Sequence, residues 1–492
     1  MSKNKEILKQ TGLYSISTIG TQLITAVSAV LTRRFLGPTQ MGIWSTLQIL
    51  VDYSKYTSLG VMSAVAVEIP YAAGKGDYEK SENIAQAAFT FVLASAAVFS
   101  GLVLLFTFVA RNRFLPQIGN GLLLVTAVIF LQRISNFFIT LLRCYKRFDI
   151  ESGQMVWSSV VNAFLIMLLS HQFRLYGFIF ALILSYIFNI VYVCMKFPFR
   201  FRWHYDPVLM RQLMVFGFPL MIQGVMTVVF RSMDRVMIAK MLGFTALGFY
   251  SIALMACAYA GNFYSAVAVV FLPHFQEKFG EKDNPRDLEK YIAKSSIGFS
   301  LVMPAFFSLI WIAAPYVISA FLPKFVAGIP AMKILSLSVF FIAIHHPYLN
   351  FLITIKKHMF LFPILGFSIL LAAAANYVVI RMGYGIQGVA AATTAGFFIH
   401  FAVLFFASFS YFTDARSALK KFLLYVGIFG YSVFALMINT RWIFPDDFSL
   451  AQVMGRTLVL IGFYLPLLFI LNKEFSVFSL LIKKLRTRGV PS

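Results

Sequence analysis

The sequence predicts an all-α protein that crosses a membrane many times, and three observations lead to that prediction. Hydrophobic residues make up 60% of the 492 residues, whereas charged residues make up only 12%. Apolar stretches of about 20 residues, the length that a helix needs to cross a bilayer, recur from end to end. These stretches are continuous, which excludes the short alternating strands of a membrane β-barrel. A soluble protein of this size does not need so much apolar sequence.

We expect about fourteen transmembrane helices. They lie near residues 8–31, 41–66, 84–109, 118–142, 152–170, 175–195, 212–238, 245–270, 294–321, 330–355, 359–381, 386–411, 421–440 and 453–471. With the N-terminus in the cytoplasm, most Lys and Arg residues of the connecting loops fall on the inner side, as the positive-inside rule requires. An even number of spans then brings the C-terminus back to the cytoplasm.

An internal repeat is the most informative feature after hydropathy. The sequence RRFLGPTQMGIWS at residues 33–45 matches AKMLGFTALGFYS at residues 239–251. Further along, NFFIT at residues 136–140 recurs as NFLIT at residues 350–354. Each repeated unit holds six spans, so both units insert with the same orientation, which is a parallel repeat.

The repeat sets the expected domains. We predict an N-terminal six-helix bundle over residues 1–200 and a C-terminal six-helix bundle over residues 201–415. Residues 416–492 then contain helices thirteen and fourteen and a basic cytoplasmic tail. Polar loops long enough to form an aqueous domain are not expected, because the longest polar segment covers only about 20 residues near Gln276–Lys294.

Composition and motifs exclude several classes of function. The net charge of +23 reflects basic loops between apolar spans, so we do not expect nucleic acid as a partner. The three cysteines, Cys144, Cys194 and Cys257, lack the spacing of a disulfide framework or a metal site. There is no P-loop motif for ATP binding. We therefore expect no enzymatic activity, no cofactor and no metal.

The segment Gln212–Ser251 places three charges in an otherwise lipid-compatible helix: Arg231, Asp234 and Arg235. Each charge at membrane depth costs about 2.5–3.5 kcal/mol on insertion scales, so these side chains should face a cavity or one another. The alternative is a helix end from which long basic side chains reach the headgroups. Arg231 lies about 18 Å of helix rise beyond Pro219, which favours the cavity.

The first predicted span carries a stripe of polar residues at steps of three, four and seven, which places them on one helix face. The stripe consists of Thr11, Ser15, Thr18, Gln22, Thr25 and Thr32. Such hydroxyls can bond to their own helix or hold helices together. A stripe this continuous favours a water-lined surface, and Gln22 and Thr25 are its candidate binding residues.

Further charged residues stand in other spans. Asp52 and Lys55 are three residues apart and can pair on one helix face, either as a structural pair or as part of a site. Arg133 has no obvious local partner, so we predict that it contacts an anionic ligand. The histidines His345, His346 and His400 are interpreted as core residues, with metal binding as the alternative.

These residues carry a family resemblance that covers nearly the whole chain. R-x-LGP-x-x-x-GIW after the first span, and FP…D-R-x-x-I…LG…LG-x-Y around the seventh, resemble the polysaccharide-exporter and O-antigen flippase branch of the multidrug/oligosaccharidyl-lipid/polysaccharide superfamily. The YGIQGVAAATT stretch at Tyr384–Thr394 fits the same pattern. The resemblance implies two six-helix bundles around a central cavity, alternating access and a location in the bacterial cytoplasmic membrane.

The resemblance also implies a substrate. Members move a polyprenyl-diphosphate-linked oligosaccharide, such as an O-antigen or capsule repeat unit, from the inner to the outer leaflet. Polysaccharide polymerases and glycosyltransferases are the implied protein partners. The family's cavity arginines match only Arg231 and Arg235, because the first span offers hydroxyls and Gln22 instead of charge. The alternatives are a cation-coupled multidrug antiporter of the same superfamily and a lipid II flippase.

Overall fold

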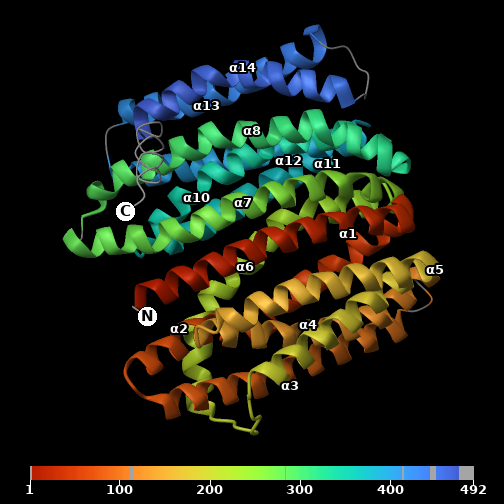
Figure 1. Ribbon diagram of the computed structural model, residues 1–492, viewed down its shortest axis with the longest axis vertical. Coiled ribbons are helices and arrows are strands. Elements are labelled where there is room, and N and C mark those ends of the chain that lie inside the picture. Colours follow the sequence, from red (N-terminus) through yellow and green to blue (C-terminus); the bar gives the residue numbers. More distant parts are fainter. Residues whose placement is uncertain are drawn as a thin grey trace, which may run out of the picture. The chain divides into compact units, whose positions relative to one another are not determined.

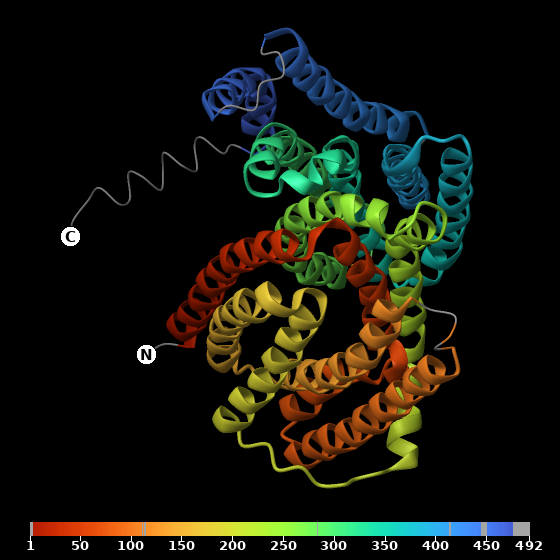
Figure 2. The same cartoon turned by 90° about the vertical axis from the view of Figure 1, so that its right-hand side faces the viewer.

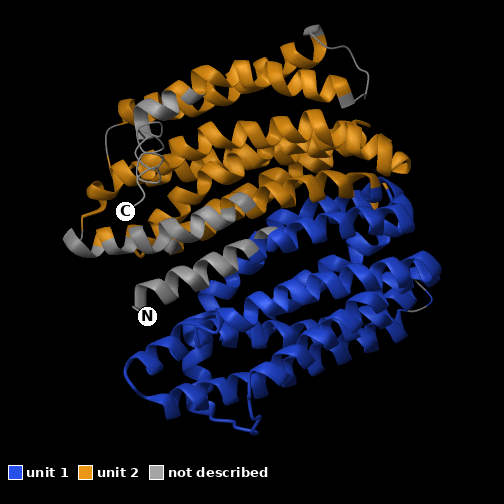
Figure 3. Cartoon of the chain, viewed as in Figure 1, with its two compact units in different colours: residues 1–239, 243–248 blue, residues 240–242, 249–492 orange. Residues whose placement is uncertain are grey.

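The protein is described by a computed structural model that covers residues 3–110, 112, 115–282, 284–412, 415–443 and 450–475. Its chain forms two compact units, shown in blue and orange in Figure 3. Unit 1 contains residues 1–239 and 243–248, and unit 2 contains residues 240–242 and 249–492. Every long element in the described residues is a helix (Figures 1 and 2).

Unit 1 is built from helices α1 to α6 and one short 3-10 helix. Their bounds are α1 Lys3–Ser54, η1 Lys55–Ser58, α2 Val61–Gly74, α3 Tyr78–Val109, α4 Pro116–Cys144, α5 Phe148–Lys196 and α6 Pro207–Met241. Helix α5 packs along both α1 and α4, and α3 packs along α4 and α2. A core of aromatic and aliphatic side chains, including Phe89, Phe137 and Phe138, joins α3 and α4.

Two of these helices each cover two predicted spans. Helix α1 bends at Gly37, whose φ of 72° no ordinary side chain favours, and Pro38 follows it. Helix α5 is interrupted at Arg174, which has φ 49° and ψ −122°. The first break is the LGP sequence between the first two predicted spans, whereas Arg174 carries no such sequence signal.

Unit 2 is built from the helices that follow. Their bounds are α7 Phe244–Lys282, η3 Pro285–Leu288, α8 Glu289–Phe321, η4 Pro323–Gly328, α9 Ile329–Ser336, α10 Ser338–Thr354, η5 His358–Phe360, α11 Leu361–Arg381, α12 Gly385–Phe409, α13 Ala415–Ile438, the π-helical turn η6 Asn439–Ile443 and α14 Leu450–Phe475. Helices α8, α10 and α12 form its centre, α11 packs on α12, and α13 and α14 pack on α8. Aromatic rings fill the core, among them Phe341, Phe401 and Phe405.

Among the described residues, ten helical segments are apolar enough and long enough to span a membrane. The prediction of an all-α membrane protein is therefore confirmed, and the predicted spans agree with the observed helices to within a few residues in most cases. The total of fourteen spans stays a prediction. Asp446, Asp447 and the basic C-terminal tail lie outside the described residues, as do the side chains of Thr11 and Ser15.

The two copies of the repeat share local backbone geometry. Gly37 and its counterpart Gly243 both have positive φ, at 72° and 90°. In α4, Thr140 Oγ1 donates to the carbonyl of Asn136 at 2.9 Å, and in α10 the matching Thr354 donates to Asn350 at 2.8 Å. These matches support the internal repeat, because each depends on the same residue type at the same position.

The repeated LG motifs also touch one another within unit 1. Thr39 and Thr245, which occupy the same position in the two copies, share a hydrogen bond of 2.9 Å between their hydroxyls. A Cβ on Gly42 would lie 1.7 Å from the carbonyl oxygen of Phe244, and one on Gly248 would lie 1.8 Å from that of Pro38. The glycines are therefore required for the close approach of α1 to the start of α7.

Helix α6 lies against the start of α2 through glycine as well. A Cβ on Gly217 would lie 2.1 Å from the carbonyl oxygen of Gly60, and a Cβ on Gly60 would lie 2.2 Å from that of Gly217. About two helical turns further along α6, Gly224 faces the ring of Tyr56 in η1. These contacts bring the charged part of α6 alongside the end of α1.

Candidate substrate site

Asp52 is the centre of the charged cluster in unit 1. It lies near the C-terminal end of α1, where the chain passes into η1. Its Oδ1 accepts from Lys55 Nζ at 3.2 Å, so the predicted pairing within α1 and η1 is present. Its Oδ2 lies 3.5 Å from Arg235 Nη2 on α6. One carboxylate therefore holds two cations from two different segments.

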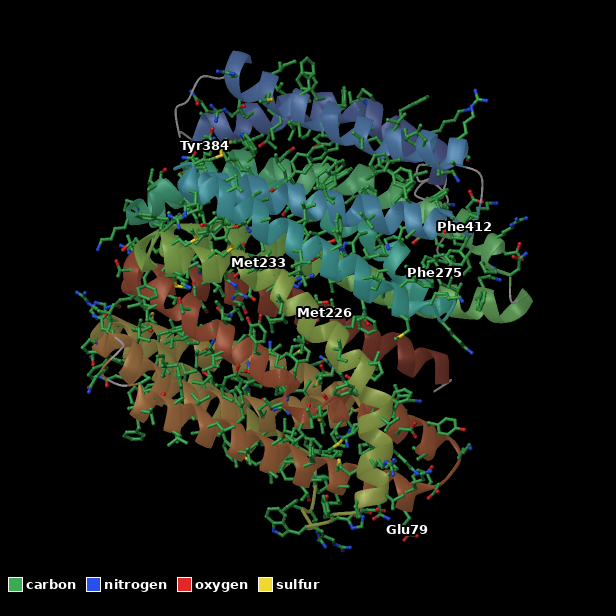
Figure 4. The ribbon with its side chains drawn as sticks, turned by 180° about the vertical axis from the view of Figure 1, so that it is seen from behind. Glu79, Met226, Met233, Phe275, Tyr384 and Phe412 are labelled. Atoms are coloured by element: carbon green, nitrogen blue, oxygen red, sulfur yellow. The ribbon has the colours of Figure 1, made fainter. Side chains whose placement is uncertain are left out.

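Helix α6 supplies the remaining charges of this cluster. Met226 and Met233 mark the course of this part of the helix in Figure 4. Arg231 is exposed, one turn before the half-buried Arg235, and it interacts electrostatically with Tyr56 of η1. The carboxylate of Asp234 is buried and accepts the backbone N–H of Arg235 at 2.7 Å. A second link ties α6 to α1, because the hydroxyls of Tyr53 and Ser232 lie 3.1 Å apart.

Arg133 lies beneath this cluster, on α4. Its side chain is only 3% exposed, and Nη1 donates to the carbonyl of Lys55 at 2.8 Å. Nε and Nη2 are buried and have no hydrogen-bond partner within the described part of the chain. In this structure the guanidinium thus supports the backbone that carries Lys55, and it does not line the cavity described below.

A polar cavity of about 380 Å³ opens inside unit 1 beside Asp52. Helices α1, α4 and α5 and the start of η1 form its walls. Three predicted site residues line it: Thr25, Asp52 and Lys55. The cavity also includes polar residues that sequence reasoning did not single out, namely Ser28, Arg33, Gln48, Gln132, Asn162 and Tyr186.

The polar stripe of α1 takes part in this cavity over its second half. Thr25 and Thr32 line the wall, and Thr32 also donates to the carbonyl of Ser28 at 2.8 Å. Gln22 is half-buried and does not line the cavity. The hydroxyls of the stripe therefore both bond to their own helix and face a cavity, so the two alternatives raised by the sequence occur together.

Some cavity residues had little signal in the sequence. Gln132 Nε2 donates to the hydroxyl of Tyr186 at 2.9 Å, which links α4 to α5 across the cavity wall. Asn162 accepts a hydrogen bond from the Ser185 hydroxyl at 3.0 Å, which links the two halves of α5. A polar residue in an apolar span was the available signal, and Gln132 stands directly before Arg133.

Together these groups make a site suited to an anion. Four cations, at Lys55, Arg133, Arg231 and Arg235, stand with the two carboxylates of Asp52 and Asp234, which leaves two positive charges. Arginine binds phosphate groups through two parallel N–H donors, and polar cavity walls provide hydrogen bonds for hydroxyl groups. The cluster therefore offers both charge and directed donors.

The histidines of unit 2 form a separate small group. The rings of His345 and His400 are 5.5 Å apart, and His400 Nδ1 lies 3.0 Å from the hydroxyl of Ser368. Among the residues that the structure describes, no three His, Cys, Asp or Glu side chains gather as a metal site would require.

Comparison with known proteins defines the class. The chain matches the family described as polysaccharide biosynthesis protein over residues 30–326, which is more than half of its length. No curated protein matches the sequence.

Solved structures share the fold. An inward-facing multidrug resistance MATE family transporter of the MOP superfamily is similar with a TM-score of 0.66 and 17% identity, covering 81% of this chain and 96% of that one. The lipid II flippase MurJ in an inward closed conformation has a TM-score of 0.65 and 16% identity, covering 94% of this chain and 99% of that one. A MOP superfamily transporter from Pyrococcus furiosus has a TM-score of 0.61 and 16% identity, covering 81% and 94%.

The described helices, and the fold shared with these structures, define the class of this chain as a multi-pass helical membrane protein. Within that class, this chain belongs to the polysaccharide biosynthesis protein family. The resemblance noted in the sequence is thereby confirmed.

Proposed function

We propose that the protein is a flippase that carries a polyprenyl-diphosphate-linked oligosaccharide, a repeat unit of a cell-surface polysaccharide such as O-antigen or capsule, from the inner to the outer leaflet by alternating access. The observation that carries this proposal is the cluster around Asp52, in which Lys55 and Arg235 share one carboxylate. An incoming diphosphate can replace that carboxylate as the partner of both cations.

The binding step follows from the charges. A diphosphate brings several acceptor oxygens, and a charged hydrogen bond contributes about 1.5–3 kcal/mol. Arg231 and Arg235 lie one turn apart on α6, so both can reach one headgroup. Because Arg231 and Lys55 are exposed, they are the first of the cations to meet a ligand. Arg133 then supports the backbone of Lys55 from below.

The sugars and the lipid tail need surfaces of different chemistry. The polar cavity beside Asp52, with Thr25, Gln132 and Tyr186 in its walls, supports binding of a hydroxyl-rich group. In unit 2, a groove of about 410 Å³ between α8 and α14 is lined almost wholly by apolar side chains, including Leu309, Leu460 and Ile461. We assign this groove to the polyprenyl tail, since its apolar walls can contact a hydrocarbon chain by van der Waals packing and leave no polar group of the groove unpaired.

The proposal places the protein in the bacterial cytoplasmic membrane with both termini in the cytoplasm. Its partners are then the lipid-linked substrate and membrane lipids, together with the glycosyltransferases that supply the substrate and the polymerase that consumes it. Positive-inside charge distribution supports this orientation. Reporter fusions at Lys146 and Lys356 are expected to read cytoplasmic.

A reconstitution experiment separates this proposal from its rivals. Purified protein in liposomes is given a fluorescent polyprenyl-diphosphate oligosaccharide in one leaflet, and its appearance in the other leaflet is followed by quenching with a membrane-impermeant reductant. We expect translocation by the parent and none by the Arg231→Ala/Arg235→Ala variant. Transport of a cationic dye without movement of the lipid-linked sugar would instead identify a multidrug antiporter.

A further inference from the structure

The connection between α5 and α6 is a non-helical segment that is fixed to α3 through its backbone. The buried amide of Gln86 donates to the carbonyl of Arg200 at 2.8 Å and accepts the N–H of Arg202 at 2.9 Å. One turn further along α3, the Thr90 hydroxyl accepts the N–H of His204 at 3.4 Å. The segment is visible as the yellow-green trace along the edge of unit 1 in Figure 2.

Aromatic rings hold one part of this segment against the core. Phe199 and Phe201 both contact the ring of Phe89 on α3, with ring centroids 5.6 Å and 5.0 Å apart. Trp203 contacts Phe201 at 4.9 Å, yet it is 76% exposed, and Tyr205 is 69% exposed. Two large amphipathic rings are thus presented outward from a segment whose backbone is fixed.

The same segment presents two unpaired cations. Arg200 and Arg202 are both exposed. Within the described residues, neither guanidinium takes part in a side-chain hydrogen bond or an ion pair. The neighbouring carboxylate of Asp206 accepts the N–H groups of Val208 and Leu209 at the start of α6, so it is occupied by the helix terminus.

The position of the segment along α3 sets its depth in the membrane. Helix α3 has 32 residues and is about 48 Å long, so it exceeds a hydrocarbon core of about 30 Å by roughly 9 Å at each end. The helix begins beside Glu79, which is labelled in Figure 4, and Gln86 lies about 12 Å further along it. For α3 centred on the bilayer, Gln86 is then about 3 Å inside the edge of the hydrocarbon core, so the segment begins at the boundary between headgroups and hydrocarbon, where Trp and Tyr are enriched.

We propose that residues 199–205, the interfacial segment, form a binding surface for acidic phospholipids of the leaflet at this end of unit 1. Arg200 and Arg202 contact the phosphate groups, while Trp203 and Tyr205 lie at headgroup level. Each arginine near a bilayer surface contributes a factor of about five to attraction of an acidic lipid, so the pair gives roughly 30-fold local enrichment. This inference concerns bilayer lipid and holds whether or not the transported substrate is a lipid-linked glycan.

Quenching by brominated lipids tests the proposal. The full-length protein is reconstituted at equal mole fractions of brominated phosphatidylglycerol or brominated phosphatidylcholine, and tryptophan fluorescence is recorded. Because the chain has five tryptophans, the Trp203 signal is obtained by difference from a Trp203→Phe variant. We expect the acidic lipid to quench Trp203 several-fold more strongly, and this preference to weaken at high salt.

Matched variants identify the groups responsible. Arg200→Gln/Arg202→Gln is expected to abolish the preference, whereas Arg200→Lys/Arg202→Lys is expected to retain most of it because the charge remains. Lys356→Gln/Lys357→Gln removes two exposed cations from the turn after α10 and is expected to leave the preference unchanged. Equal quenching by both lipids in the parent, or an undiminished preference in a monodisperse double glutamine variant, would overturn the proposal.

Discussion

The cavity of unit 1 and the groove of unit 2 have similar volumes, about 380 Å³ and 410 Å³, but differ in polarity. The first lies beside Asp52 and has mixed walls, in which hydroxyl, amide and charged groups stand among apolar side chains such as Trp44 and Phe178. The second is lined by aliphatic side chains, with Thr457 and Tyr464 as its polar members. The proposed substrate, with a charged, sugar-bearing head and a long hydrocarbon tail, has parts suited to each.

The two copies of the internal repeat show which positions stay the same and which change. The local backbone conformation is the same in both copies, as the positive φ of Gly37 and Gly243 indicates. The residues that face open space have diverged instead. Thr25 of the first copy corresponds to Arg231 of the second in the repeat alignment. The glycine and asparagine–threonine positions that set the local backbone are therefore the same in both copies, whereas the charge at position 25 and its counterpart 231 differs.

The largest effect is expected from Arg231. We predict that Arg231→Ala abolishes polysaccharide export in a complementation assay while the protein still inserts at normal levels. Arg231→Lys should restore part of the activity, because the charge remains but the planar donor pair is lost. Arg211→Ala, an exposed arginine at the start of the same helix, serves as the control and should export normally.

A smaller effect is expected from filling the groove of unit 2. Ala305→Trp places a bulky ring among the apolar residues and overlaps with a bound tail, and overpacking of this kind costs about 1–3 kcal/mol, or roughly 5- to 150-fold in affinity. The loss should appear with a long polyprenyl substrate and vanish with a short-chain analogue. An equal loss with both substrates would contradict the assignment of this groove to the polyprenyl tail.

A substitution at Asp52, beside the cavity of unit 1, is expected to strengthen binding, whereas the preceding substitutions weaken it. Since its carboxylate competes with the ligand for Lys55 and Arg235, we predict that Asp52→Asn binds a diphosphate about tenfold more tightly but transports it more slowly. Titration of the purified variant and the liposome assay measure the two quantities. Asp149→Asn removes a carboxylate from the exposed ion pair with Arg147 and should change neither. Weaker binding by Asp52→Asn would contradict competition.

The smallest effect is expected at Asp234. Its carboxylate accepts the N–H of Arg235, and an asparagine oxygen can accept the same bond. Asp234→Asn is therefore predicted to lower transport less than Arg231→Ala does, because the bond to the backbone of Arg235 is kept. A severe loss in the same assay would mean that the charge itself is needed, as for a group that carries a proton or a cation.

Most of the fold was accessible from the sequence because apolar length and glycine–proline breaks determine it. The bend of α1 followed from Gly37 and Pro38, and the pairing of Asp52 with Lys55 followed from their spacing. The contact of Asp52 with Arg235 did not, since 183 residues separate them. Predicting it requires knowing that Gly60 and Gly217 allow α6 to approach closely.

Arg133 illustrates the limit in the opposite direction. An arginine without a local partner in an apolar span predicted a contact with an anionic ligand, and the structure shows its side chain 3% exposed and bonded to the carbonyl of Lys55. A side chain–backbone bond between α4 and η1 has no signature in either local sequence. Its contact with an anionic ligand stays a prediction, now through the two N–H groups that have no partner within the described residues.

The most direct test of the account is the affinity of the purified, full-length protein for a polyprenyl diphosphate without its sugars. Each arginine contact is worth about 10- to 150-fold, so Arg231→Ala/Arg235→Ala should weaken binding at least 100-fold relative to the parent and to Arg211→Ala. Binding by a monodisperse double variant with the affinity of the parent would contradict the central claim, that the charged cluster of α6 and Asp52 holds the diphosphate.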